Sequence, residues 1–219
     1  MNETDSTHPG GRGLVDSVHQ DLLEKILSGE LPPNQTLLER PVAMSLGVSR
    51  TVLREALRQL EGQRFVGRRD DGSLFVRPIT VEELLDVLHV RALLESDAAS
   101  RAVGRLDVEQ LKQLRGRVIA VRDAENPDLA EHEQIDGMLH DLIAARGGGE
   151  VVRSVIFDMR RRNRMFSMKR IPSRFHAVCE EHLSILDALI AEKPEEAASA
   201  VRTHINNIRE SVIQWLKHT

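Results

Sequence analysis

Hydrophobic residues recur at helical spacing in the first fifth of the chain. The first such set predicts an amphipathic helix that ends at Gly29; it consists of Leu14, Val15, Val18, Leu22, Leu23, Ile26 and Leu27. A Leu-Pro-Pro-Asn turn follows, and its Asn34 tolerates a positive φ. A second, short helix is predicted over residues 40–46, with Pro41 in its first turn, where the missing amide costs little.

The segment from Leu46 to Leu60 predicts a third helix with two different faces. Gly47 supplies a turn, and Ser49 stands where an N-cap residue is expected. The apolar residues recur at i, i+3, i+4 and i+7, which predicts one buried stripe of Leu53, Ala56, Leu57 and Leu60. Another face carries Arg50, Arg54 and Arg58 at four-residue intervals. A DNA-recognition helix and a solvated charged face both agree with this segment alone.

A hairpin is predicted after the third helix. Phe65-Val66 and Leu74-Phe75-Val76 are short β-prone runs, and the segment 68–73 between them contains Gly72. Residues 40–77 also contain eight arginines and four acidic residues, a local charge of +4, whereas the whole chain has a charge of −4. This asymmetry favours a nucleic-acid-binding face on an otherwise acidic protein.

These residues resemble the GntR family of bacterial winged helix-turn-helix regulators. The resemblance lies in Gly29-Glu30-Leu31-Pro32-Pro33, Leu38-Glu39-Arg40, the run LGVSRTVLREAL from Leu46 to Leu57, and Gly72-Ser73-Leu74-Phe75-Val76. It implies that a DNA operator is contacted by Arg40, Ser49, Arg50, Thr51 and Arg54, with Gly72 at the wing tip near the minor groove. Two features depart from the family pattern: Asn34 replaces a usual glycine, and Asp70-Asp71 place negative charge near the wing tip.

Helical periodicity replaces the strand signal after Pro78. Thr80, followed by Glu82 and Glu83, predicts an N-cap with an acidic first turn. Helices are expected at about 80–101, 107–123, 127–146, 149–169, 175–191 and 194–217. We therefore expect a mainly α protein: a disordered arm over residues 1–12, a winged helix-turn-helix domain over 13–78, and an all-α bundle of about six helices over 80–219.

Composition narrows the class of protein further. The chain has 219 residues, of which 41% are hydrophobic, which is enough for two domains with buried cores. A single cysteine, Cys179, allows no internal disulfide and agrees with a reducing cytoplasm. No run of eighteen apolar residues and no apolar leader is present, so we expect a cytoplasmic protein without a membrane span. No phosphate-binding glycine-rich loop follows a predicted strand.

Four side chains of the predicted bundle could form a metal site. Asp136 and His140 are four residues apart on one helix, so both leave from one face. His182 and His204 lie about eleven residues from the Lys193-Pro194 turn, so antiparallel helices bring them level, each roughly 16 Å from the turn. One carboxylate and three imidazoles suit zinc, nickel or manganese. Surface or hydrogen-bonded core histidines are the alternative, and His132 and Glu133 are rival ligands.

The second half of the chain resembles the FCD ligand-binding domain that accompanies many GntR heads. The pattern Asp136-x-x-x-His140, Glu181-His182 and His204 carries this resemblance and implies a divalent metal ion at Asp136, His140, His182 and His204. It also implies a small carboxylate effector, for which Arg91 is the candidate counter-charge unless Arg91 pairs with Glu95 one turn away. Consecutive residues spread around a helix, so in the run from Arg160 to Arg164 we expect most side chains to face solvent and one to be able to point inward.

The expected function is that of a ligand-responsive, homodimeric transcriptional regulator, a repressor rather than an activator, and not an enzyme. Two heads would bind a near-palindromic double-stranded operator. Two alternatives stay open: a metal-dependent hydrolase that uses the Asp/His cluster with Glu133 or Glu181 as general base, and a GntR-type regulator whose helical domain holds no metal.

Overall fold

The computed structural model describes residues 9–166 and 174–217. The chain divides into two compact units, Met1–Ile79 and Thr80–Thr219, each with its own core. Both the winged helix-turn-helix and the helical bundle expected from the sequence are present, so the predicted fold class is confirmed. Most of the arm expected over residues 1–12 falls outside the described residues, and the first helix begins at Pro9.

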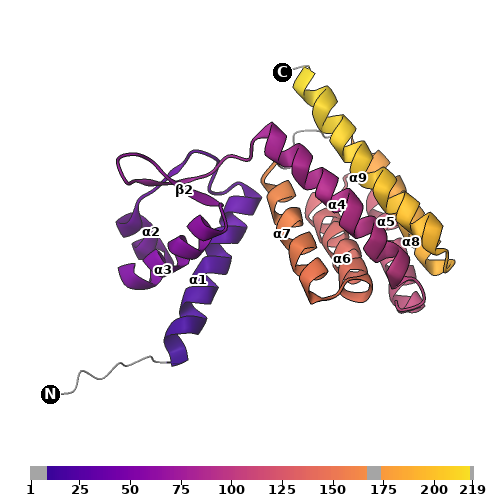
Figure 1. The fold of residues 1–219 in the computed structure, drawn as a ribbon, viewed down its shortest axis with the longest axis horizontal. Coiled ribbons are helices and arrows are strands. Elements are labelled where there is room, and N and C mark those ends of the chain that lie inside the picture. The colour runs from indigo at the N-terminus through magenta and orange to yellow at the C-terminus, as the bar shows by residue number, and fades with distance from the viewer. Residues whose placement is uncertain (1–8, 167–173, 218–219) are drawn as a thin grey trace. The chain divides into compact units, whose positions relative to one another are not determined.

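The first unit combines three helices with a small antiparallel sheet (Figure 1). Its helices are α1 (Pro9–Ser28), α2 (Glu39–Leu46) and α3 (Arg50–Gly62). Its strands are β1 (Thr36–Leu37), β2 (Val66–Arg68) and β3 (Leu74–Val76), in the order β1-β3-β2. Strand β1 was not predicted, because two residues show no measurable periodicity. It pairs with β3 and so ties the wing to the turn before α2.

The start of α3 has the geometry that the sequence predicts. Gly47 closes α2 with a φ of +65°, a conformation that favours glycine. The Ser49 hydroxyl accepts a hydrogen bond from the amide of Val52 at 3.3 Å, which makes Ser49 the N-cap. The predicted apolar stripe is buried, each member at most 1% exposed: Leu53, Ala56, Leu57 and Leu60. The stripe faces α1 and α2, so the opposite face of α3 lies at the surface.

The second unit is a bundle whose described residues form six helices. They are α4 (Val81–Ala102), α5 (Val108–Arg122), α6 (Leu129–Gly147), α7 (Glu150–Phe166), α8 (Phe175–Ile190) and α9 (Pro194–Lys217). Helix α4 packs against α6, α7 and α9, so it forms the centre of the bundle. Helices α4 and α9 lie side by side over much of their length (Figure 1). The C-terminal part of the predicted helix 149–169 lies outside the described residues.

A close approach between α4 and α6 depends on one glycine. A Cβ atom on Gly147, at the end of α6, would lie 1.7 Å from the carbonyl oxygen of Ala98 on α4. No side chain fits at that distance, so glycine lets the two backbones touch. This contact fixes α6 against the helix that carries Arg91 and Glu95.

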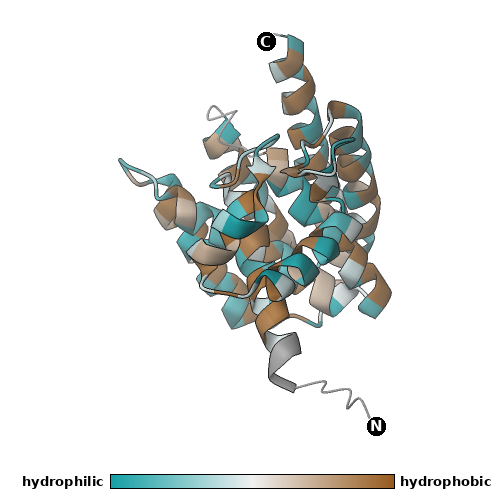
Figure 2. Ribbon diagram, turned by 90° about the vertical axis from the view of Figure 1, so that its left-hand side faces the viewer, coloured by the Kyte–Doolittle hydropathy of each residue, from teal (hydrophilic) through white to brown (hydrophobic). Residues whose placement is uncertain are grey.

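The helices are amphipathic rather than uniformly apolar. Figure 2 shows hydrophobic and hydrophilic bands alternating along them. Among the described residues, no helix combines the length and the apolar character needed to span a bilayer.

Candidate metal centre and nucleic-acid interface

The six residues predicted to contact DNA are all exposed in the first unit. They lie on α2, at the N-cap and first turns of α3, and in the loop between β2 and β3: Arg40, Ser49, Arg50, Thr51, Arg54 and Gly72. Exposed arginines at the N-terminal end of a helix favour anions, because the helix dipole is positive there. All six residues are therefore accessible to a nucleic acid, as a nucleic-acid interface requires.

Arg54 is held in place by a neighbouring helix. Its Nε donates a hydrogen bond to Glu39 Oε2 at 2.7 Å, which links α3 to the first turn of α2. The Arg54 side chain remains 50% exposed. Since a guanidinium has five N–H donors, Arg54 can keep this bond and still offer donors to a base edge or a phosphate.

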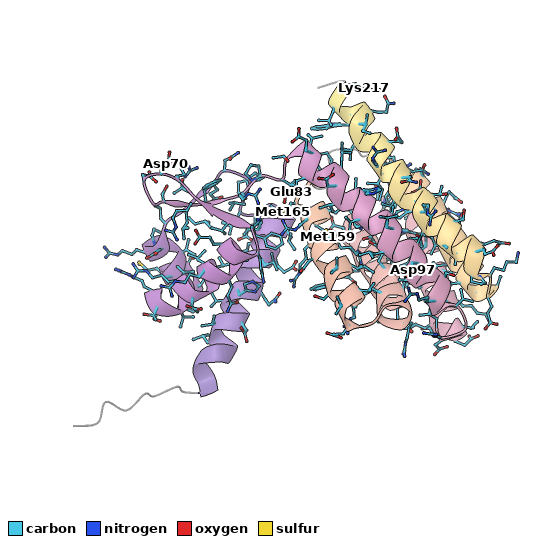
Figure 3. All side chains as sticks on the ribbon, viewed as in Figure 1. Asp70, Glu83, Asp97, Met159, Met165 and Lys217 are labelled. Carbon is cyan, nitrogen blue, oxygen red and sulfur yellow. The ribbon has the colours of Figure 1, made fainter. Side chains whose placement is uncertain are left out.

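Both arginines at the start of the wing loop, Arg68 and Arg69, are engaged by neighbouring residues. Arg68 pairs with Glu61 at 2.9 Å, and Arg69 donates to Thr36 Oγ1 and lies over the ring of Phe75. Asp70 lies at the far end of the loop between β2 and β3 (Figure 3). Hydrogen bonds from the side chain and then from the backbone amide of Ser73 lower the pKa of the neighbouring Asp71 below its ordinary value. The tip is therefore acidic.

The four predicted metal ligands converge in the second unit. Asp136 and His140 come from α6, His182 from α8 and His204 from α9. One ligand atom from each lies within 4.8 Å of the others. The equal spacing of His182 and His204 from the α8–α9 turn brings their ring centroids to 4.9 Å, as the sequence predicts. All three histidines are fully buried, whereas the Asp136 side chain is 35% exposed, so Asp136 is the member of the cluster nearest to solvent.

The donor atoms of this cluster fit a divalent cation. The Nε2 atoms of His140, His182 and His204 are buried, and no described residue hydrogen-bonds to any of them. Asp136 Oδ1 lies 3.4 Å from His182 Nε2 and 3.7 Å from His140 Nε2. Buried polar atoms without partners destabilise a fold by about 1–3 kcal/mol each. Three such nitrogens and one carboxylate oxygen facing a common centre are what a zinc, nickel or manganese site requires.

The protonation states also suit metal binding. Burial lowers the pKa of His140, His182 and His204, which favours the neutral imidazole that can donate a lone pair. Burial alone would raise the pKa of Asp136, but the charge of Arg160 and the nearby His182 hold that pKa well below its ordinary value. The cluster therefore presents neutral imidazoles and an ionised carboxylate near neutral pH.

Both rival ligands lie apart from the four convergent atoms. The ring of His132 stacks on that of His182, with centroids 5.8 Å apart and planes at 24°. It is not a member of the cluster, and neither is Glu133, which is exposed.

Arg91 is placed behind the cluster. It is 3% exposed, and its Nε donates to Glu95 Oε1 at 2.6 Å. The sequence allows two roles for Arg91, a counter-charge for the effector or a partner of Glu95. The structure shows the pair with Glu95, and the role in effector binding stays a prediction.

Three residues hydrogen-bond to the cluster in roles that the sequence did not predict, although Glu181 is the general base in the hydrolase alternative. Glu95 accepts a hydrogen bond from Nδ1 of His140, and Glu181 Oε2 accepts one from Nδ1 of His204 at 2.8 Å. Arg160 Nη2 donates to Asp136 Oδ2 at 2.7 Å and is 9% exposed, so it is the member of the arginine run that points inward. The only sequence signals were the i, i+4 spacing of Arg91 and Glu95, the position of Glu181 beside His182, and the arginine run itself.

Comparison with known proteins covers both units. The description "Bacterial regulatory proteins, gntR family" matches residues 14–76, and "FCD domain" matches residues 86–207. The chain is 25% identical to the Nta operon transcriptional regulator of Aminobacter aminovorans, over 84% of this chain and 88% of the relative. It is 24% identical to the Glc operon transcriptional activator of Escherichia coli, over 92% and 89%. The fold is similar to that of E. coli McbR/YncC, with a TM-score of 0.76, 21% identity, and coverage of 92% and 97%.

Proposed function

The chain belongs to the GntR family of bacterial regulatory proteins and carries an FCD domain, and we propose that this domain senses a small organic acid through a bound divalent metal ion. The family consists of DNA-binding transcriptional regulators with a ligand-binding domain, so the chain is a regulator of this kind and not an enzyme. The hydrolase alternative is thereby removed.

The observation that carries the proposal is the set of three buried, unpartnered imidazole nitrogens beside Asp136 Oδ1. In the proposed site Asp136, His140, His182 and His204 hold zinc, nickel or manganese. The bound ion supplies a Lewis acid for a carboxylate oxygen. Four protein ligands leave one or two positions open on an ion that prefers five or six, and the partly exposed Asp136 lies where a small molecule from solvent can reach them.

In the proposed mechanism, DNA binding depends on the exposed start of α3. Arg50 and Arg54 would read base edges, while Ser49 and Thr51 would hold phosphates; Arg40 and Gly72 would add contacts from α2 and the wing tip. A homodimer would place two heads on the half-sites of a near-palindromic operator in the cytoplasm, where the bacterial chromosome lies. Repression is the proposed outcome, and the effector would act by binding two arrangements of the dimer unequally.

The experiment starts from an operator selected out of random-sequence duplex DNA by the tag-free protein. We expect a near-palindromic site and a solution mass of twice the 24.6 kDa of one chain. A panel of small carboxylic acids is then screened against Zn²⁺-loaded protein for a change in operator affinity.

Asp136→Ala is the control in this screen, because it alters the sensor and leaves the head intact. We expect it to bind the operator normally and to lose the response. A wild-type protein that responds equally well after complete removal of metal would contradict the proposal and favour a GntR-type regulator without a metal.

A further inference from the structure

Two of the three histidines in the candidate metal site have a carboxylate directly behind them, fully buried in Glu95 and 12% exposed in Glu181. We propose that Glu95 and Glu181 are positioning residues: each accepts the Nδ1 proton of one histidine and thereby turns the bare Nε2 of that ring toward the metal. This inference rests on the proposed function, because it assigns roles around the same metal site. It adds two residues, and the arginines that hold them, to the four ligands.

Glu95 positions His140 from a different helix. It lies on α4, is fully buried, and accepts a hydrogen bond from His140 Nδ1 across the α4–α6 contact. Because an ionised carboxylate can only accept, the imidazole proton must lie on Nδ1, which leaves the Nε2 lone pair toward the cluster. Arg91 Nε donates a hydrogen bond to Glu95 Oε1 at 2.6 Å, and this ion pair fixes the carboxylate behind His140. Arg91 therefore acts through Glu95.

Glu181 positions His204 in the same way, although its neighbour in the sequence is His182. Its Oε2 accepts from His204 Nδ1 at 2.8 Å, and its Oε1 accepts from Asn207 Nδ2 at 2.8 Å. Arg174 Nη2 lies 2.7 Å from Oε1 and 2.8 Å from Oε2. These bonds hold the Glu181 carboxylate in place behind His204.

The carboxylate ligand is oriented by a third arginine. Arg160 Nη2 donates to Asp136 Oδ2 at 2.7 Å and to the backbone oxygen of Asp136 at 3.1 Å. With Oδ2 occupied, Oδ1 is the oxygen that faces the histidines, so Asp136 would bind the metal through one oxygen. His182 differs, since its Nδ1 is buried without a partner among the described residues and its ring is held by stacking on His132.

A purely structural role for these ion pairs is the alternative, and the two roles predict different results. Buried pairs that serve only the fold would change the stability of the metal-free protein and leave metal affinity unchanged. Positioning residues would change metal affinity and ligand geometry, since such outer partners typically contribute 10–100-fold to metal affinity, as an order of magnitude.

The test compares Glu95→Gln and Glu181→Gln with wild type in the full, tag-free chain. Zn²⁺ affinity is measured by competition with a chelating indicator, and the absorption bands of bound Co²⁺ report ligand geometry. We expect each variant to bind Zn²⁺ about 10–100-fold more weakly and to shift the Co²⁺ bands. The matched control is Asp187→Asn, which removes a carboxylate on α8 that pairs with Arg115 at 2.6 Å on the surface; it should behave like wild type.

The possible results separate the two proposals. Thermal unfolding of each metal-free variant shows whether it folds; if Glu95→Gln does not fold, the less buried Glu181, whose side chain is 12% exposed, provides the test. Folded variants with wild-type Zn²⁺ affinity and Co²⁺ bands would overturn the positioning role and leave the metal site intact. Wild-type protein that binds neither Zn²⁺ nor Co²⁺ would overturn the metal site and the positioning role together.

Discussion

Arg50 and Arg54 are the side chains on which DNA recognition is proposed to depend most. If each reads a base edge, replacing either by alanine should weaken operator binding by about 1–3 kcal/mol. Fluorescence anisotropy with the selected operator, at one fixed salt concentration, measures this loss. Arg101→Ala is the control, because Arg101 is a 56% exposed arginine of α4 that pairs with Asp97. Near-normal affinity in both head variants would contradict the assignment of α3 as the recognition helix.

The sequence was sufficient to find the four candidate ligands but not the residues behind them. Asp136 and His140 follow from the i, i+4 rule, and His182 and His204 follow from their equal distances to a short turn. In contrast, Glu95 and His140 are 45 residues apart in the sequence and lie on two different helices. Hydrophobic periodicity alone does not specify how these two helices pack. Helical spacing did show that Glu95 could pair with Arg91, yet only the packing of α4 on α6 shows that Glu95 also hydrogen-bonds to His140.

At the scale of elements, the packing of α6 on α4 depends on Gly147. Gly147→Ala would place a methyl group 1.7 Å from the Ala98 carbonyl, so the helices must separate. We expect the free energy of unfolding to fall by about 1–3 kcal/mol. Gly116→Ala in α5 is the control, because that Cβ meets nothing within 4 Å and should stabilise the protein by about 0.5–1 kcal/mol. Urea unfolding compares the two, and equal effects would show that the close approach is unimportant.

Removing negative charge at the wing tip is expected to strengthen operator binding, whereas removing Arg50 or Arg54 is expected to weaken it. If the tip approaches phosphates, Asp70→Asn removes a repulsion, which is worth at most about 1 kcal/mol in water, and should tighten operator binding by up to about fivefold. The gain should shrink as salt rises, because screening weakens the repulsion. Anisotropy titrations at several salt concentrations measure it, with Asp187→Asn as control. An unchanged affinity at low salt would indicate that the tip stays away from the DNA.

Element boundaries were predicted well where caps and breaks are local. Thr80 caps α4 as expected, with its hydroxyl accepting from the Glu83 amide at 3.1 Å, and α9 covers the predicted residues 194–217. Asn34 adopts the positive φ that its position in the turn allows, at 69°. Strand β1 was missed because its two residues pair with β3 through a contact that is distant in sequence. Local chemistry therefore predicted the helices, and long-range pairing had to come from the structure.

On the scale of the whole molecule, the chain combines a DNA-binding unit, in which residues 40–77 carry a net charge of +4, with a helical unit that contains a cluster of buried imidazoles. The family assignment explains why the two occur together, since one binds DNA and the other binds an effector. In the proposed mechanism, a metal ion within the helical unit binds the buried imidazoles and has open coordination positions for a carboxylate effector. Sensing then depends on one bound ion.

The metal content of protein purified without a histidine tag or chelator tests this central claim most directly. We expect roughly one zinc, nickel or manganese ion per chain, as one four-ligand site holds. Asp136→Ala and His182→Ala should lose the ion, whereas His132→Ala should keep it, because His132 lies outside the four convergent ligands. A wild-type protein that contains no metal and takes up none from added zinc, nickel or manganese would contradict the account.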